Sequence, residues 1–332
     1  MKASQKLVLL LATYFLANTV SVSAKPPEYC NARPLGKPGI AIAATLDPTL
    51  VIGEPLKGLG KDQGYGVDSV DPVSDALISQ LNKKFGSYPL FWGRYISNRP
   101  EWLLKQSEVS TLAKYGIRVL PLAQQTMRFN DIDAKTKSTY DTGIADGICN
   151  ADAFITVFSI TPDDSNSYHI FLNIEIDQQT PVNSEYFKGW TVGLTKGVQK
   201  AGRKISLLPA VYIGTTGSIE SWKALEIAVA DLGKPLSAGW IARYGKGYTG
   251  KPALKCKDID RWRDNSQLNN LSFPTDGVGA WQYQENCYVE DRRKLVDVSI
   301  LNPAPAVRTS FINGLIEPKI TPMIGSTALL TH

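Results

Sequence analysis

Apolar residues follow two different spacings between residues 64 and 233. In some segments they recur every three or four residues, which is typical of amphipathic helices, and in others they form the short runs typical of strands. The helical segments are 71–85, 107–115, 142–158, 184–201 and 222–232, and the strand-like runs are 65–68, 90–96, 117–124, 170–177 and 205–213. This regular alternation predicts five βα units and a parallel sheet.

The helical spacing stops after Gly233. Three more strand-like runs follow, joined by loops, at residues 238–244, 278–283 and 295–300. Five β/α units followed by about three plain strands predict an α/β fold, an irregular TIM-like (β/α) barrel. An open doubly wound sheet is the alternative. Neither a Gly-x-Gly-x-x-Gly turn before a helix nor a phosphate-binding loop is present, so nucleotide binding has no signature.

The two ends of the chain differ from the middle. Residues 1–24 combine two lysines, an apolar run of about ten residues and a small-residue site, as a signal peptide does. A retained membrane anchor is the alternative, although a span needs about 20 apolar residues. We expect an irregular extension over 25–63, the barrel over 64–301 and an extended tail over 302–332, which holds four prolines. The protein is therefore expected to be secreted, with no later transmembrane segment.

Charge and histidine content narrow the chemistry. Without Lys2 and Lys6, 34 basic residues face 31 acidic ones, a balance too even to indicate a nucleic-acid partner. The two histidines, His169 and His332, are too few for a His-rich metal site or several Ser-His arrangements. We expect no metal and no cofactor, and we expect acid and base chemistry to come from carboxylates.

The four cysteines are an even set without Cys-x-x-Cys spacing. Pairing is the default in an oxidising compartment, and four cysteines allow three connectivities. A Cys256–Cys287 disulfide is favoured because both residues flank one irregular stretch, and Cys30 would then pair with Cys149. Four buried free thiols are the alternative.

Carboxylates cluster on the fourth strand-like run. Asn173, Glu175 and Asp177 alternate with apolar residues, so they share one face of the strand. Active sites of parallel barrels lie at the carboxyl ends of the strands, and Asp68 ends the first strand there. Paired carboxylates in this position are what glycoside hydrolysis needs, with Glu175 as general acid and Asp177 and Asp68 as ionised partners.

A structural role is the alternative for this cluster, in a buried ion-pair network with Arg94 or Arg243. Other polar and aromatic side chains are predicted near the same strand ends. Flat rings with a polar edge suit the faces of a sugar, although ordinary core packing would use the same residues. The expected substrate-binding residues are Asn173, Arg94, Tyr95, Gln124, Tyr212, Trp240, Trp281 and Gln282.

Several short motifs, taken in order, resemble one family. They are Gly64-Tyr65-Gly66-Val67-Asp68, Gly93-Arg94-Tyr95-Ile96, the passage from Glu108 to Pro121, and the strand from Ile170 to Asp177. Over residues 64–283 this pattern is similar to a secreted bacterial glycoside hydrolase-like family, domain of unknown function 1906. The resemblance implies a barrel related to family 25 glycoside hydrolases, the muramidase lysozymes, and a role at the cell envelope.

One position departs from the muramidase pattern. Those enzymes carry Asp-x-Glu on the fourth strand, where this chain has Asn173-Ile174-Glu175. The resemblance implies that Glu175 matches the proton donor and that Asn173 replaces the first carboxylate. The expected function is therefore hydrolysis of peptidoglycan or another amino-sugar polymer, and the alternative is a non-catalytic carbohydrate-binding or envelope-associated protein on the same barrel.

Overall fold

The computed structural model describes residues 64–97, 102–124, 139–174, 181–214, 219–242, 253–259, 262 and 277–318. The strands are β1 (Tyr65–Asp68), β2 (Phe91–Ser97), β3 (Arg118–Gln124), β4 (Ser167–Ile174), β5 (Ser206–Gly214), β6 (Gly239–Ala242), β7 (Leu254–Lys255), β8 (Val278–Tyr288) and β9 (Leu295–Leu301). The helices are α1 (Asp75–Phe85), α2 (Gln106–Lys114), α3 (Thr139–Val157), α4 (Ser184–Lys200), α5 (Ile219–Leu232) and α6 (Pro305–Asn313).

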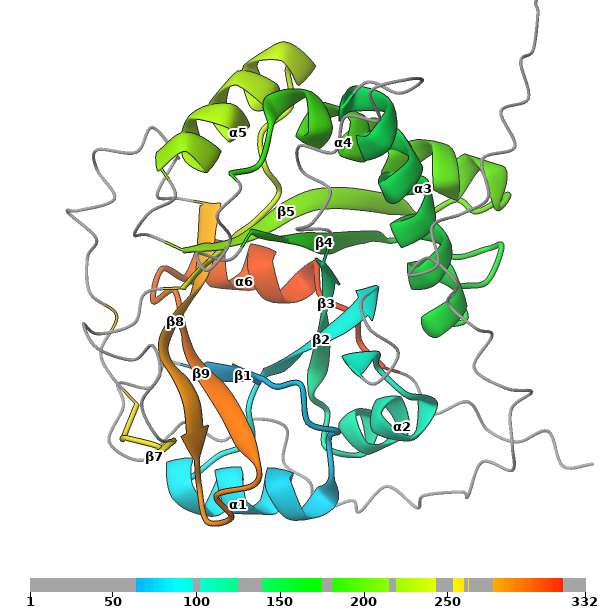
Figure 1. The fold of residues 1–332 in the computed structure, drawn as a ribbon. Coiled ribbons are helices and arrows are strands. Elements are labelled where there is room, and N and C mark those ends of the chain that lie inside the picture. The colour runs from blue at the N-terminus through cyan, green and yellow to red at the C-terminus, as the bar shows by residue number, and fades with distance from the viewer. Residues whose placement is uncertain are drawn as a thin grey trace, which may run out of the picture.

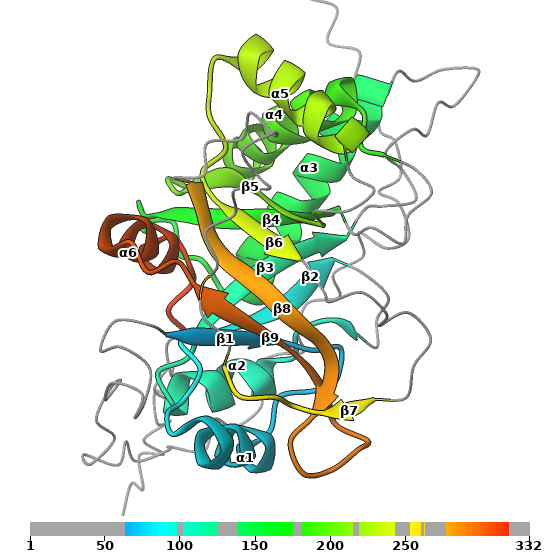
Figure 2. The same ribbon diagram turned by 90° about the vertical axis from the view of Figure 1, so that its left-hand side faces the viewer.

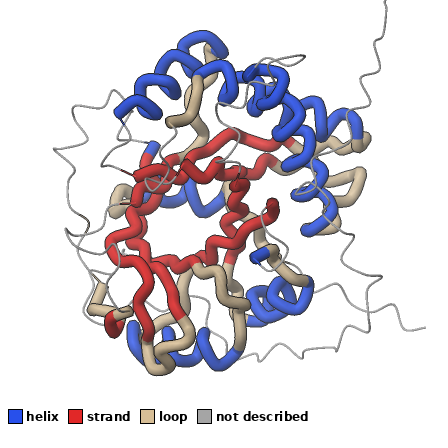
Figure 3. The backbone as a smooth tube through the Cα atoms, in the orientation of Figure 1, coloured by secondary structure: helices blue, strands red, loops and turns tan. Residues whose placement is uncertain are grey.

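Eight strands close into a barrel. The order is β6-β5-β4-β3-β2-β1-β9-β8, and β8 pairs with β6 to complete the ring seen in Figure 3. Strands β1 to β6 and β8 run parallel, whereas β9 is antiparallel to both of its neighbours. Helices α1 to α5 surround the ring and β7 lies outside it (Figure 1). The predicted irregular barrel is confirmed, and the open sheet is not formed.

Local sequence signals set the helix ends. Ser74 precedes α1 in an extended conformation, and its side chain accepts a hydrogen bond from the Leu77 backbone N–H. At the other end Gly86 has a φ of 77°, and its N–H donates to the Asn82 carbonyl at 2.7 Å. These are the N-cap and glycine C-cap arrangements that satisfy unpaired backbone groups of a helix.

Helices α3 and α4 pack with their backbones in contact. A Cβ atom on Gly147 would lie 2.2 Å from the Trp190 carbonyl oxygen, so only glycine permits this approach. Two buried hydrogen bonds cross the interface: Tyr186 Oη donates to Asp146 Oδ2, and Trp190 Nε1 donates to Asn150 Oδ1, each at 2.8 Å. The pair therefore forms a close-packed support behind β4 and β5.

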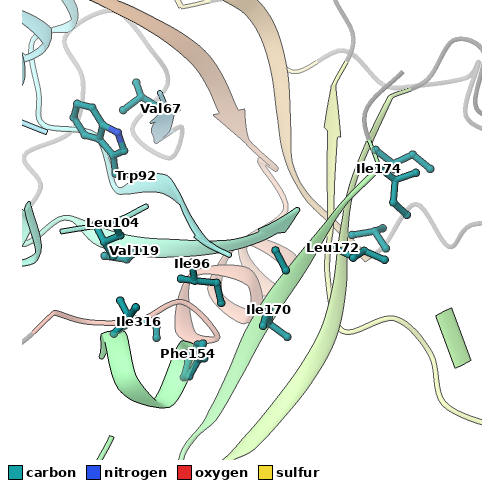
Figure 4. Packing of buried hydrophobic residues seen from close by; sticks show 14 of the residues in the cluster. Val67, Trp92, Ile96, Leu104, Val119, Phe154, Ile170, Leu172, Ile174 and Ile316 are labelled. Carbon is teal, nitrogen blue, oxygen red and sulfur yellow. The ribbon is translucent and has the colours of Figure 1, made fainter. Parts of the chain in front are cut away.

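The apolar core has two layers. Outward-facing strand residues pack against the helices, and Figure 4 shows part of this layer, including Val67, Trp92, Ile96, Ile170 and Leu172. Inward-facing residues fill the barrel interior. The inner cluster includes Phe91, Leu120, Leu122, Phe171, Ala210, Tyr212, Trp240, Ala280, Leu301 and Phe311. Alternation along each strand assigns neighbouring residues to the two layers.

The segment after β9 is a helix, where an extended tail was expected. Pro305 occupies the first turn of α6, where a missing backbone N–H costs nothing, and no proline follows before the helix ends at Asn313. Figure 2 shows α6 at the end of the barrel opposite to the one toward which β2, β3 and β6 point. Phe311 contacts Phe91 and Phe171 there, with ring centroids 5.6 and 5.7 Å apart. Helix α6 thus closes the amino end of the barrel.

The backbone after α6 joins two strands at this same end. Ile316 pairs with Val119 of β3, and His169 N–H of β4 donates to the Gly314 carbonyl at 2.7 Å. The His169 ring is buried, with Nδ1 3.0 Å from Ser237 Oγ and Nε2 3.3 Å from the Ser310 carbonyl. Burial lowers the pKa of His169 below its usual value of 6.5.

The predicted Cys256–Cys287 disulfide is present and links β7 to β8. Cys149 is also disulfide-bonded, whereas Cys30 lies outside the described residues, so its pairing with Cys149 stays a prediction. The proposed signal peptide and extension lie outside them as well. Within the described ranges, the helices are too short or too polar to span a membrane.

Candidate functional site

Polar side chains replace apolar ones at the carboxyl end of the barrel interior. Asp68 ends β1 and pairs in register with Gly93 of β2. A Cβ atom on Gly93 would lie 2.7 Å from Asp68 Cβ and 3.1 Å from Trp240 Cη2. A larger residue than glycine at position 93 would therefore crowd both Asp68 and the Trp240 ring. The Asp68 side of β1 faces the interior, as its predicted role requires.

A second carboxylate, Asp297, lies opposite Asp68. The two residues are register partners on the antiparallel strands β1 and β9, so their side chains leave the sheet on the same face. Asp297 is partly exposed, whereas Asp68 is 8% exposed. Two donors orient Asp297: Gln282 Nε2 donates to Oδ2 at 2.8 Å, and the Asn286 N–H donates to Oδ1 at 2.5 Å. Asp297 was not among the predicted site residues.

A buried chain of hydrogen bonds leads to Asp297. Tyr212 Oη donates to Gln282 Oε1 at 2.5 Å, and Gln282 in turn donates to Asp297. The Tyr212 ring lies against Trp240, with centroids 4.1 Å apart, and Trp240 Nε1 donates to Ser299 Oγ at 3.0 Å. Tyr212, Trp240 and Gln282 were expected to bind substrate; they lie close together, but each is at most 1% exposed. They support the site from beneath.

Tyr95, Asn173 and Gln124 meet on the other side of this end. Asn173 Nδ2 donates to Tyr95 Oη at 3.2 Å, and Gln124 is the register partner of Asn173 on β3. Asn173 is fully buried, whereas Gln124 is half-buried. The Trp102 ring, half-buried, lies 6.2 Å from that of Tyr95. Trp102 was not predicted as a site residue, because it lies after β2 and not within a strand.

The prediction that Arg94 binds substrate was wrong, because Arg94 does not face the barrel interior. Its neighbour Tyr95 faces inward, so Arg94 points to the helices. There it is fully buried and forms an ion pair with Glu108, with Nε 2.9 Å from Oε1 and a second bond from Nη2 to Oε2 at 3.2 Å. Arg94 Nη1 also donates to the Ser69 carbonyl at 2.5 Å. Arg94 is therefore a residue that holds the turn after Asp68.

Glu108 completes this arrangement. Oε1 accepts from the Val73 N–H and Oε2 from the Lys105 N–H, each at 3.0 Å. The buried charge of Glu108 is thus met by one guanidinium and two backbone donors, as a buried carboxylate requires. Arg94 thus pairs with an acid from α2, whereas Glu175, Asp177 and Arg243 of the network considered for β4 lie outside the described residues.

The prediction that Trp281 binds substrate was also wrong. Its neighbours Ala280 and Gln282 face the interior, so Trp281 faces outward. Its ring lies 6.0 Å from that of Tyr283, on the same face, and Tyr283 packs against the outer layer of the core. Trp281 therefore lies away from the carboxyl end of the interior, where a sugar was expected to bind.

Glu175 and Asp177 lie outside the described residues, as does Arg243. The described part of β4 ends at Ile174, one residue before Glu175. Within the described ranges, no group of three or more His, Cys, Asp and Glu side chains is placed to hold a metal ion. The site is thus an irregular (β/α) barrel end that presents two facing carboxylates, amides and aromatic rings.

Comparison with known proteins gives only distant structural likeness. No protein-family model and no curated protein sequence matches the chain. The solved modular autolysin LytC from Streptococcus pneumoniae, in complex with a synthetic peptidoglycan ligand, is 11% identical, with 73% of this chain and 47% of that chain covered and a TM-score of 0.40. This chain therefore spans about half the length of the autolysin.

Two other solved structures are similar to the same extent. A family 25 glycosyl hydrolase from Bacillus anthracis is 14% identical over 72% of this chain and 88% of that chain, with a TM-score of 0.35. The spore cortex lytic enzyme SleM from Clostridium perfringens is 11% identical over 74% and 68%, with a TM-score of 0.40. Structural similarity this weak gives no evidence about the function of this chain.

Proposed function

We propose that this protein is a secreted glycoside hydrolase-like enzyme that cleaves peptidoglycan or another amino-sugar polymer by carboxylate acid and base chemistry. The main support is the facing pair Asp68 and Asp297 at the carboxyl end of the barrel, where parallel barrels carry out their chemistry. A glycosidase needs one protonated acid and one ionised partner, and Asp68 with its register partner Asp297 supplies carboxylates for the ionised side.

The proposed proton donor is Glu175. In the sequence it stands two residues after Asn173, whose side chain lies in the interior. In this role Glu175 protonates the leaving glycosidic oxygen, and Asp68 or Asp177 orients water or stabilises the positive charge that develops on the sugar. Gln124, which is half-buried, then binds a sugar hydroxyl group, and its buried neighbours Asn173 and Tyr95 support it from the interior.

The resemblance to domain of unknown function 1906 and to family 25 muramidases belongs to this proposal. The Cys256–Cys287 disulfide supports the export part, because disulfides persist in oxidising compartments. Amino-terminal sequencing of the exported protein is expected to give Lys25 as the first residue. A full-length chain that stays in the membrane would contradict removal of residues 1–24.

Binding without cleavage is the second candidate function. The observation that favours it is the neutral Asn173 amide, which donates to Tyr95 Oη at the position where the muramidase-like pattern has a carboxylate. A barrel that lacks one carboxylate on its fourth strand would still hold a glycan through its amides and rings.

One pair of measurements separates the two functions. The mature protein, Glu175→Gln and Asp68→Asn are incubated with insoluble peptidoglycan and other amino-sugar polymers, and released reducing ends and bound protein are measured. Enzyme action predicts a loss of about a hundredfold or more in turnover for both variants, with binding retained. Glu290→Gln, which changes an exposed carboxylate at the tip between β8 and β9, is the matched control and is expected to keep full turnover.

The outcomes differ clearly. A wild-type protein that binds glycan but releases no reducing ends from any polymer supports the binding function. Full turnover in Glu175→Gln shows that another group donates the proton.

A further inference from the structure

Strand β8 carries an irregularity beside Asp297. Gln284 pairs with Val298 and Cys287 pairs with Val296, so two residues of β8, Glu285 and Asn286, stand opposite one residue of β9. This is a β-bulge, and Asn286 within it has a φ of 48°. Asparagine is the residue other than glycine that best tolerates this left-handed conformation. The bulge turns the Asn286 N–H toward Asp297 Oδ1.

The β7 segment, residues 254–257, holds this bulge from outside at three points. The Lys257 N–H donates to Gln284 Oε1 at 3.0 Å, just before the bulge. Just after it, Cys256 is linked to Cys287 by the disulfide, and the Cys256 N–H donates to the Tyr288 carbonyl at 2.8 Å. These contacts bracket Asn286 on both sides, although β7 has only two residues in the sheet and lies outside the barrel.

We infer that β7 and its disulfide position Asp297 by fixing the Asn286 N–H, which makes Asn286 a positioning residue for the catalytic carboxylate pair. The inference rests on the proposed function in one respect, namely that Asp68 and Asp297 take part in catalysis. The coupling itself rests on contacts alone. A bulge stores extra chain that shifts its register unless neighbouring contacts hold it. Without the disulfide, the Asn286 N–H leaves Asp297, while the bond from Gln282 stays.

The test uses the mature chain with the Cys149 disulfide intact and compares Cys256→Ala/Cys287→Ala with the wild type. Hydrogen exchange of the Asn286 amide in ¹⁵N-labelled protein is expected to accelerate by about tenfold or more. We also expect kcat for reducing-end release to fall by about tenfold with KM unchanged. Val296→Ala is the matched control. It weakens the same hairpin through a buried side chain but leaves the disulfide in place. Neither the exchange of the Asn286 amide nor kcat is therefore expected to change as it does in the double alanine variant.

Three further variants keep the test decisive if the double alanine variant does not fold. Asn286→Gly keeps both the N–H and the positive φ and is expected to behave as the wild type, whereas Asn286→Val disfavours that φ and is expected to show fast amide exchange at position 286 and reduced kcat. Gln284→Leu removes one of the three contacts with β7 and is expected to give a smaller change in the same direction.

The results separate the inference from the proposed function. An Asn286 amide that stays protected without the disulfide overturns the inference, and so does fast exchange with unchanged kcat. A wild-type protein that releases no reducing ends refutes the enzyme proposal. In that case amide exchange alone decides whether β7 positions Asp297, with fast exchange in the double alanine variant supporting the coupling.

Discussion

The two ends of the barrel interior are filled in opposite ways. At the amino end, α6 places Phe311 against Phe91 and Phe171 and buries apolar surface. At the carboxyl end, Asp68 and Asp297 face each other above a buried chain of amide and hydroxyl groups. The first arrangement lowers the free energy of the folded state, whereas the second places two like charges side by side.

This difference indicates a division of labour along the barrel. Residues at the amino ends of barrel strands commonly serve stability, and those at the carboxyl ends commonly serve chemistry. Like charges on directly opposite residues of paired strands lower stability, so the carboxyl end is expected to contribute less to stability than the apolar end. Each of the following predictions tests one side of this contrast.

The largest effect is expected at the apolar end. Phe311→Ala removes a side chain that is 2% exposed and leaves a cavity between three elements, so the free energy of unfolding is expected to fall by about 3–5 kcal/mol. Urea unfolding followed by fluorescence measures the change. Ile227→Ala, at a side chain that is 53% exposed, is the control. A loss below about 1 kcal/mol in Phe311→Ala would show that α6 is not part of the core.

A similarly large loss is expected behind the polar end. Arg94→Met leaves the Glu108 carboxylate buried without its cation, which is expected to cost about 3–5 kcal/mol. The control is Arg293→Met, which breaks an exposed ion pair and is expected to leave the unfolding midpoint unchanged. If Arg94→Met and a Glu108→Gln variant lose equally little, the pair does not hold the turn after Asp68.

A change of opposite sign is expected inside the site. Asp68→Asn removes one of two like charges on directly opposite residues, so the free energy of unfolding is expected to rise by about 0.5 kcal/mol while turnover is lost. Urea titration gives the free energy of unfolding, and reducing-end release by the same preparation gives the turnover. A variant that is clearly less stable than the wild type would contradict the idea that the facing pair costs stability.

The smallest effect is a pH dependence at the amino end. Burial lowers the pKa of His169 in the folded chain below its usual 6.5, so as pH falls through that value the unfolded chain takes up a proton first. Stability is therefore expected to fall as pH drops below about 6.5 and to level off, for this group, below the folded-state pKa. His169→Gln is expected to flatten the urea midpoint between pH 7 and pH 5 relative to the wild type. Parallel curves for the two proteins would refute this.

The barrel could be predicted from periodicity because strands and helices alternate regularly over residues 64–233. The same periodicity also explains two errors. Arg94 and Tyr95 are neighbours on one strand, as are Trp281 and Gln282, so only one member of each pair faces the interior. Arg94 and Trp281 were predicted to bind substrate because of their chemistry, whereas their position in the strand decides which layer of the core they enter.

Asp297 was missed for a topological reason. Polar residues were sought at the carboxyl ends of strands, and β9 is antiparallel, so its first residues lie at that end of the barrel. The direction of the last strand depends on tertiary pairing and has no local signal in the sequence. Helix α6 was missed because the four prolines of residues 302–332 suggested an extended segment, although Pro305 stands where a helix tolerates it.

The position of β9 has a consequence for the order in which the protein can be completed. The first strand, β1, lies next to the last one, so the ring stays open until residues 295–301 are available. Until then β1 and β8 each present an unpaired edge, and such edges recruit strands from other chains. A nascent or truncated chain that stops before residue 295 is thus exposed to aggregation. Delivery of an unfolded chain across a membrane before closure would spare the cell that hazard.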